Sequence, residues 1–274
     1  MSEQAAWISV DQLAHGFGEN NLSPVDDLAG QHFDFHFENG WVISHEFISA
    51  DELIWKIGAE GEAFTETYSA IMPREGIYFV DFEKKSEPGT TVSLVMDLEK
   101  GIATAVLSVM PSREEIARPM LDRALSGDKL RSVQVDFLRA RLDAPFESGE
   151  RAFHAQTDEL VGRRVEYAYS QEEVYEHIYL NNEGYTWHCL KGSEAGLCDT
   201  DYCSYRKIDD AHYLFVWEEK VIPTVGVLLI DFEAMRSCGK LVGYQGTTTD
   251  ALSNFSVGAK ATVLNTTHYP CLSK

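Results

Sequence analysis

The sequence predicts an all-β protein with short helices, built as two tandem antiparallel barrels joined by a helical connector. The first observation is an internal repeat, in which the segment 28–37 is echoed by 160–169 and the segment 92–99 by 225–233. The second is a succession of short runs in which apolar and polar residues alternate, separated by turn residues. A strand-built repeat of this length indicates two copies of one β domain.

The chain divides into four regions by pattern. We expect a leader over 1–27, an N-terminal barrel over 28–110, a connector with a short helix over 111–156 and a C-terminal barrel over 157–274. Strands of the first barrel are predicted at 33–37, 41–47, 53–57, 63–71, 76–83, 90–98 and 102–109. Strands of the second are predicted at 185–190, 199–206, 212–218, 224–232 and 240–245. Short strands in simple succession close best as an up-and-down barrel.

The connector begins with a capping box, because Ser112 and Glu115 stand three residues apart before an apolar series at helical spacing. Gly127 ends this helix, alternation resumes at 133–137, and Ser148 marks a loop. Many of the chain's basic residues lie in this connector. We expect them to pack across an acidic barrel, with an anion-binding patch as the alternative.

Length and composition are those of a soluble globular protein with two domains. The chain has 274 residues, of which 44% are hydrophobic and 24% charged. No window reaches the roughly 18 uninterrupted apolar residues of a membrane helix. Residues 1–7 show no basic segment followed by an apolar one, so we expect no secretory signal and a cytoplasmic protein.

The charge balance restricts the class of partner. There are 23 Lys and Arg residues against 44 Asp and Glu residues, which gives a net charge of −21. This charge repels phosphate backbones and anionic lipids, so we expect neither nucleic acid nor membrane as a partner. The expected partner is a small hydrophobic or aromatic molecule. Attraction of a cationic substrate is an alternative that net charge does not decide, and a homodimer is likewise left open.

We expect no metal and no cofactor. The cysteines all lie in the second half without a C-x-x-C pair, which is typical of free thiols in a reducing compartment: Cys189, Cys198, Cys203, Cys238 and Cys271. His32 and His36 share a strand face, but four strand residues span about 13 Å, too far for one ion. Dinucleotide, nucleotide, zinc-protease and serine-hydrolase motifs are absent from the sequence.

The candidate ligand site lies in the second barrel. Where the first barrel has Phe35 and Phe37, the second has Tyr167 and Tyr169, and their spacing places both phenols on one strand face. Inward hydroxyl groups are costly unless they are bonded to each other, to water or to a ligand. We therefore predict a ligand cavity there, with a core filled by aromatic side chains as the alternative. Further candidates in this half are Tyr179, Trp187, His188, Asp201, Tyr202, Tyr205 and Trp217.

Four of these residues are candidate catalytic groups. Tyr167 and Tyr169 can hold or protonate an oxygen of the substrate, and His188, or Asp201 with a pKa raised by burial, can move a proton. Tyr179, Trp187, Tyr202, Tyr205 and Trp217 are the predicted ligand-binding residues. Decarboxylation, double-bond isomerisation, hydration and cyclisation all suit such a set without a cofactor.

Three segments of the first barrel resemble the phenolic acid decarboxylases. They are 33–41, which ends in Asn39-Gly40-Trp41, 75–78 and 90–94. These enzymes are small lipocalin-like (calycin) barrels. The whole chain, with its leader, basic connector and second barrel opening at Leu160, resembles the two-domain family named for molybdenum cofactor biosynthesis protein F, the MoaF-like proteins. This resemblance implies two lipocalin-like barrels and a small-molecule ligand.

The decarboxylase resemblance also implies roles by position. In those enzymes two strand tyrosines grip the substrate carboxylate, with an arginine and a glutamate nearby. Phe35 and Phe37 stand at the tyrosine positions, Lys56 is near the arginine position and Glu66 near the glutamate position, so the first barrel is not expected to run that decarboxylation. Trp41 and Glu66 are its candidate ligand-binding residues.

The second barrel keeps the phenol pair, and its glutamate position falls near Asp201. The resulting prediction is a cofactor-free lyase or isomerase that acts on a small aromatic or conjugated substrate in a barrel cavity. The alternative is a non-catalytic ligand-binding or regulatory protein associated with molybdenum-cofactor or aromatic-compound metabolism. A third hypothesis is a structural role, with both barrels filled by side chains.

Overall fold

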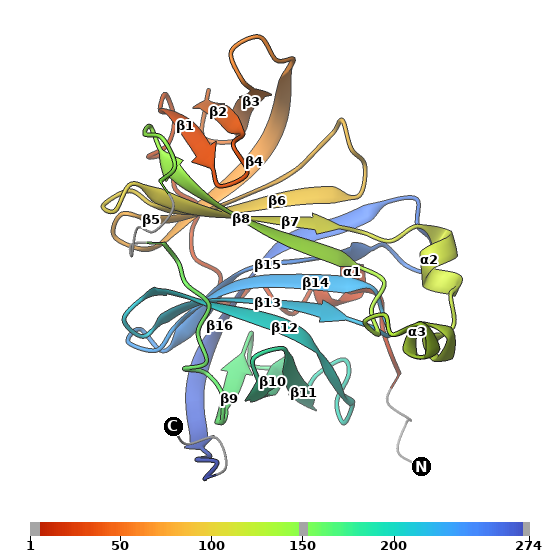
Figure 1. Cartoon of the computed structure of the whole chain (residues 1–274). Helices are drawn as coiled ribbons and strands as arrows, with labels where there is room; N and C mark the ends of the chain where they lie inside the picture. Colours follow the sequence, from red (N-terminus) through yellow and green to blue (C-terminus); the bar gives the residue numbers. More distant parts are fainter. Residues whose placement is uncertain (1–5, 148–152, 271–274) are drawn as a thin grey trace. The chain divides into compact units, whose positions relative to one another are not determined.

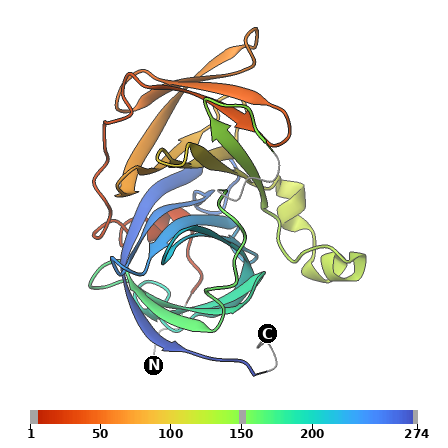
Figure 2. The same ribbon diagram turned by 60° about the vertical axis from the view of Figure 1, so that its left-hand side comes forward.

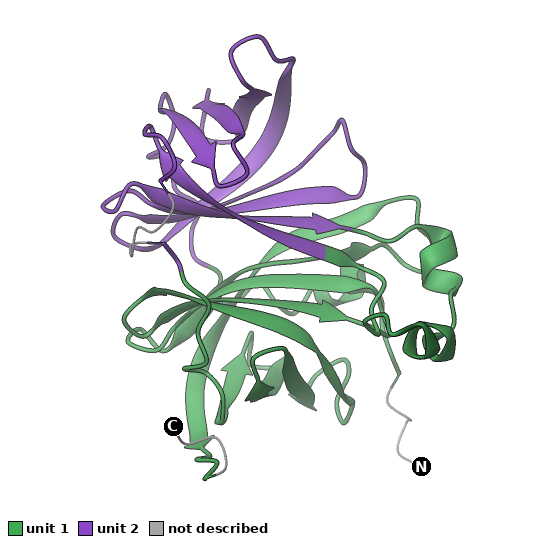
Figure 3. Ribbon diagram, viewed as in Figure 1, with its two compact units in different colours: residues 1–21, 110–134, 155–274 green, residues 22–109, 135–154 purple. Residues whose placement is uncertain are grey.

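The computed structural model describes residues 6–147 and 153–270, and it contains two closed barrels of antiparallel strands (Figure 1). The all-β fold class is thereby confirmed. The chain divides into two compact units: residues 22–109 and 135–154 form one, and residues 1–21, 110–134 and 155–274 form the other (Figure 3). Each unit contains one barrel.

The N-terminal barrel is a meander in which every strand pairs with its neighbours in the chain. Its strands are β1 (His32–Phe37), β2 (Val42–Phe47), β3 (Glu52–Ile57), β4 (Ala63–Arg74), β5 (Ile77–Glu83), β6 (Thr90–Asp97), β7 (Ile102–Val109) and β8 (Gln134–Leu142). Pairing of Phe35 in β1 with Leu142 in β8 closes the ring. As the alternation predicts, Phe35 and Phe37 are buried, whereas His32 is exposed beside Asp34.

The C-terminal barrel repeats this arrangement. Its strands are β9 (Arg163–Ala168), β10 (Val174–Asn181), β11 (Gly184–Lys191), β12 (Cys198–Asp209), β13 (His212–Glu219), β14 (Thr224–Asp231), β15 (Arg236–Tyr244) and β16 (Leu252–Thr266). Pairing of Tyr167 in β9 with Ala261 in β16 closes it. Figure 2 shows this barrel nearly end-on, as a ring of teal and blue strands.

Three short helices occur in the described residues: α1 (Val10–Leu13), α2 (Arg113–Ala117) and α3 (Met120–Ser126). The predicted single connector helix is two helices, because Pro119 disfavours the helical conformation of Arg118, whose backbone is extended. The Ser112 side chain caps α2 by accepting the Glu115 amide N–H. None of the described helices is long and apolar enough to cross a membrane.

The compact units differ from the expected ranges at two places. The expected connector 111–156 contains β8, which is the strand that closes the N-terminal barrel. The expected leader contributes residues up to Asn21 to the unit of the C-terminal barrel. Both differences arise from long-range pairing, which strand periodicity does not report. The predicted loop at Ser148, residues 1–5 of the leader, and Cys271 lie outside the described residues.

Candidate functional site in the C-terminal barrel

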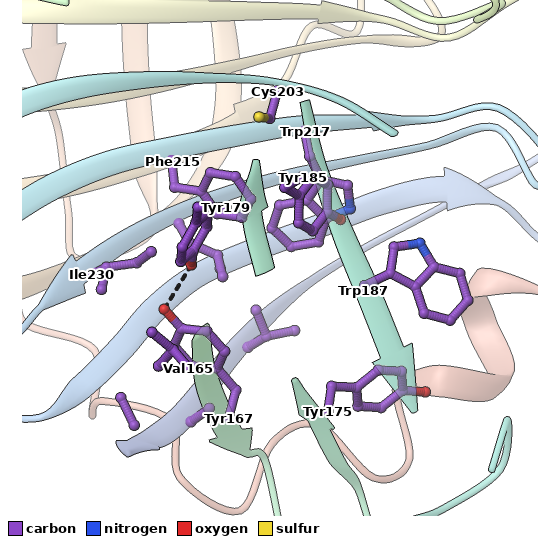
Figure 4. Packing of buried hydrophobic residues seen from close by; sticks show 14 of the residues in the cluster. Val165, Tyr167, Tyr175, Tyr179, Tyr185, Trp187, Cys203, Phe215, Trp217 and Ile230 are labelled. Carbon is purple, nitrogen blue, oxygen red and sulfur yellow. Dashed lines mark hydrogen bonds between the residues drawn. The ribbon is translucent and has the colours of Figure 1, made fainter. Parts of the chain in front are cut away.

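Tyr167 of β9 and Tyr169, which directly follows this strand, point into the C-terminal barrel and are almost wholly buried. The hydroxyl oxygens of Tyr167 and Tyr179 lie 2.8 Å apart and form one hydrogen bond (Figure 4). Burial raises the pKa of both Tyr167 and Tyr169, so these phenols are neutral donors at ordinary pH. The Tyr167 hydroxyl is therefore already satisfied by a side chain of the neighbouring strand.

Two of the predicted site residues face away from this interior. His188 lies on the outer face of β11, with its Nδ1 2.9 Å from a carboxylate oxygen of Glu176, which also binds Arg164. Tyr202 lies on the outer face of β12, where the Lys129 ammonium stands 5.2 Å from its ring centroid. Each follows an inward residue directly, so strand alternation turns it outward.

Asp201 does point inward, and its carboxylate is fully engaged. One oxygen accepts the indole N–H of Trp187 at 2.9 Å, and the other accepts the backbone N–H of Lys220 at 3.1 Å. Burial raises the pKa of Asp201, and the nearby Lys220 ammonium opposes that rise. The structure therefore joins two predicted residues, Trp187 and Asp201, in one contact.

Aromatic rings occupy much of the barrel interior. Tyr205 stacks on Phe215 with ring centroids 5.7 Å apart, and Phe215 stacks on Trp217 at 5.2 Å. The Tyr179 ring packs against the Phe215 ring in a T-shaped contact. A cavity with a volume of about 30 Å³, large enough for a water molecule, lies beside these rings. The ring system is thus a packed core with a small cavity at one side.

The cavity gathers titratable groups that the sequence prediction did not include: His177, Glu194 and Glu219. His177 is inward by alternation with Tyr175 and Tyr179, and Glu219 by its place two residues after Trp217, so strand parity could have found both. Glu194 lies in the loop after β11, where no periodicity marks it. The lining also includes Tyr169, Tyr175, Tyr185, Trp187 and Trp217.

These groups have strongly shifted pKa values. Burial, reinforced by the nearby Asp201 carboxylate, raises the pKa of Glu219 well above its ordinary value, although its carboxylate accepts the Trp217 indole N–H at 3.0 Å. Burial likewise raises the pKa of Glu194, which accepts the Tyr175 hydroxyl at 3.1 Å. Burial lowers the pKa of His177 to about 3. The interior therefore favours protonated carboxyl groups beside a neutral imidazole.

The leader contributes part of the cavity wall. The Phe17 ring lies 4.2 Å from the Tyr169 ring between centroids and 5.5 Å from the Tyr175 ring. The Asn20 side-chain amide holds the segment by donating to the backbone carbonyls of Ala168 and Tyr169, each at 3.0 Å. A leader expected only to precede the first barrel therefore packs against the site.

The remaining candidates, Trp41 and Glu66, belong to the N-terminal barrel. Trp41 is half exposed and lines a cavity inside that barrel. Glu66 is buried, and one of its carboxylate oxygens accepts the Lys85 backbone N–H at 3.0 Å. Within the described residues, no group of three or more His, Cys, Asp and Glu side chains is placed to hold a metal ion.

Comparison with known proteins assigns the family. Residues 5–112 match the MoaF N-terminal domain, and residues 154–267 match the MoaF C-terminal domain. The chain is 39% identical over 273 residues to Protein MoaF of Klebsiella aerogenes, which covers 98% of this chain and 99% of that protein.

A solved structure from Burkholderia vietnamiensis, provisionally assigned as a beta-lactamase, is 14% identical with a TM-score of 0.33. It covers 38% of this chain and 95% of its own. The two domain matches, together with a relative that is similar over almost the entire length, confirm the family predicted from the sequence: the chain belongs to the MoaF family.

Proposed function

We propose that the protein binds a small aromatic or conjugated molecule in its C-terminal barrel and transforms it by cofactor-free proton transfer, as a lyase or isomerase. The observation that carries this proposal is the set of groups around one cavity: two carboxyl groups with raised pKa values, a neutral imidazole and three phenols. Clusters of strongly shifted groups are typical of catalytic sites.

Each group has a role that suits its protonation state. Glu219 and Glu194, whose pKa values are raised by burial, serve in their protonated form as general acids toward an oxygen or carbon of the substrate. The neutral His177 imidazole has an Nδ1 without a hydrogen-bond partner among the described residues, and it can hold a substrate proton or oxygen. Tyr169 and Tyr175 add neutral donors, and the aromatic walls bind the flat body of the substrate.

The small cavity volume implies that the leader must move. A molecule the size of one aromatic ring requires more space than about 30 Å³, and Phe17 already supplies one ring to that space. We propose that the substrate takes the place of the Phe17 ring. Replacement of this ring, as in Phe17→Ala, then opens the site and lowers the substrate concentration needed for half-saturation.

The first experiment identifies the molecule. Protein purified from its own host is analysed by native mass spectrometry, with gentle release of any bound compound, and a panel of phenolic and conjugated acids is followed by ultraviolet absorption. We expect Glu219→Gln, which keeps the shape but loses the acidic proton, to lower turnover by about 100-fold or more. Catalysis at this cavity is refuted if Glu219→Gln retains full turnover of a compound that the native protein converts.

Two variants serve as controls. Glu172→Gln changes an exposed glutamate that pairs with Lys191 outside the barrel, and its turnover is expected to equal that of the native protein. His188→Gln tests the group that the sequence placed in catalysis and the structure places on the outer wall. We expect this variant to retain turnover as well; a large loss would restore His188 to the mechanism.

A second candidate function is a binding protein without catalysis, which the family's name connects with molybdenum cofactor biosynthesis. The observation that favours it is the filling of the barrel: Tyr167 and Tyr179 satisfy each other, and stacked rings occupy much of the interior. Saturable binding without product in the same panel, unchanged by Glu219→Gln, would select this function.

A further inference from the structure

We infer that the N-terminal barrel is a second binding site, which takes a small aromatic carboxylate with its ring in the barrel and its carboxylate at Lys84. This inference stands on the N-terminal barrel alone and does not depend on the proposed catalysis. Its basis is a cavity of about 70 Å³ inside the barrel.

The walls of this cavity suit an aromatic ring. They are apolar apart from His45 and Lys84, and they include the flat side chains of Phe37, Trp41 and Trp55. At the mouth, Trp41 is 49% exposed and Ile57 is 43% exposed. Large apolar side chains exposed together at the mouth of a cavity are typical of a ligand-binding site.

Lys84 supplies the single charge of the lining among the described residues. Its side chain is only 13% exposed, and its ammonium lies 5.0 Å from the centroid of the Trp55 ring. The ammonium pairs with Glu87, whose side chain is 58% exposed, and it has further N–H groups to donate. Burial lowers the pKa of His45 to about 4, so this histidine adds no charge at neutral pH. The interior therefore presents a cation to an entering anion.

The internal repeat shows that this cation is a specific difference between the barrels. Glu66 accepts the backbone N–H of Lys85, whose ammonium donates to the Thr65 carbonyl oxygen. The same pattern recurs in the C-terminal barrel, where Asp201 accepts the backbone N–H of Lys220, whose ammonium donates to the Thr200 carbonyl oxygen. Lys85 therefore corresponds to Lys220, and the preceding residues, Lys84 and Glu219, correspond to each other.

A second difference leaves hydrogen-bonding groups open in the N-terminal barrel. Trp187 donates its indole N–H to Asp201, whereas the corresponding Trp55 N–H has no partner among the described residues. His45 Nδ1 is likewise buried without one. Both residues line the cavity. Buried polar groups are nearly always satisfied, so the Trp55 indole N–H favours a ligand with an oxygen acceptor.

The test uses three probes of nearly the same shape: benzoate is an anion, benzamide is neutral and benzamidine is a cation. The chain has five tryptophans, of which Trp41 and Trp55 line this cavity. Their indole N–H signals in isotope-labelled protein, assigned with Trp→Phe variants, report binding to the N-terminal barrel. We expect benzoate to shift both signals saturably, benzamide to bind about tenfold more weakly and benzamidine to bind more weakly still.

Two substitutions at Lys84 and its partner make the inference falsifiable. Lys84→Met keeps the apolar stem but removes the charge, and it should reduce benzoate affinity to that of benzamide. Glu87→Gln removes the competing carboxylate and should strengthen benzoate binding severalfold. Lys56→Met is the matched control, because Lys56 follows Trp55 on β3, lies outside the cavity lining and should leave binding unchanged.

The inference is overturned if benzoate and benzamide bind equally, if Lys84→Met binds benzoate like the native protein, or if no probe shifts Trp41 and Trp55. Shifts confined to Trp187 and Trp217 also overturn it, since those residues line the C-terminal cavity. Spectral dispersion of each variant shows whether it is folded. Because turnover is not measured, failure here leaves the proposed catalysis untouched, and failure of that catalysis leaves this site untouched.

Discussion

The two barrels share a scaffold but differ in what fills it. Both close through eight antiparallel strands in the same order, and both use an acidic residue on the fourth strand to hold a lysine after the fifth. The N-terminal interior has phenylalanines at the β1 positions where the C-terminal interior has buried tyrosines. At the corresponding end of the fifth strand, one barrel has Lys84 and the other Glu219. The two barrels therefore share their strand pairing, whereas their inward side chains differ in chemistry.

The largest expected effect follows from packing around Gly226. A Cβ atom at this position would lie 2.2 Å from the ring of Trp217, whereas Val92, at the corresponding position of β6 opposite Phe82, carries its side chain without obstruction. Gly226→Val should lower the free energy of unfolding of the C-terminal barrel by about 3 kcal/mol or more. Thermal unfolding followed by Trp187 and Trp217 measures it.

The matched substitution Val92→Gly removes side-chain volume from the N-terminal barrel and should destabilise that barrel alone. Trp41 and Trp55 provide its signals. If Gly226→Val left the C-terminal barrel as stable as before, the inward position of Trp217 would be refuted.

The next prediction concerns the pH dependence of stability, which should differ between the two barrels. Burial lowers the pKa of His177 to about 3 and that of His45 to about 4, from 6.5, so both barrels should lose stability as pH falls below 6.5. The raised pKa of Glu219 acts in the opposite direction: its contribution is complete below the ordinary value of 4.5 and is lost as pH rises through the folded-state value. As pH rises through the folded-state pKa of Glu219, the C-terminal barrel should therefore lose a contribution that the N-terminal barrel, with Lys84 at the corresponding position, does not have.

Glu219→Gln isolates the contribution of this carboxyl group to the pH dependence of stability. We expect the variant to be more stable than the native protein at alkaline pH, by about 1–3 kcal/mol, and to show a flatter pH dependence. Chemical unfolding at a series of pH values, read from the tryptophans of each barrel, gives the two curves. Parallel curves for native protein and variant would show that Glu219 is ionised without cost.

The last effect concerns the hydroxyl pair that has no counterpart in the N-terminal barrel. Tyr167→Phe removes one partner and leaves the buried Tyr179 hydroxyl unsatisfied, which should cost about 1–3 kcal/mol of stability. The double variant Tyr167→Phe, Tyr179→Phe makes this pair resemble Phe35 and Phe47 of the N-terminal barrel, and it should cost less than the sum of the single substitutions. Equilibrium unfolding of the four proteins completes the cycle, and strict additivity would contradict the hydrogen bond.

The same variants test the catalytic role predicted for Tyr167. If its hydroxyl serves only the pair with Tyr179, Tyr167→Phe retains turnover of a compound that the native protein converts. Abolished turnover in a folded variant would place the hydroxyl in the reaction.

The sequence by itself determined the architecture and the orientation of most strand residues. The repeat and the two-residue alternation predicted two barrels and placed Tyr167 and Tyr169 inside, because successive side chains of a strand point to opposite faces. The prediction of His188 as a catalytic group did not apply this alternation, which turns His188 outward next to the inward Trp187. The local pattern is enough to predict which face of a strand a residue occupies, because that depends on one strand alone.

Only the tertiary structure decided which inward groups meet. The pairing of Tyr167 with Tyr179, the entry of Glu194 from a loop, the packing of Phe17 and the closure by β8 each join segments that are distant or irregular in the sequence. Such contacts depend on strand register and barrel closure, which bring side chains of different strands to one level and leave no periodic signal in the chain. The shifted pKa values follow from that burial, so the chemistry of each interior emerges with the closed barrel.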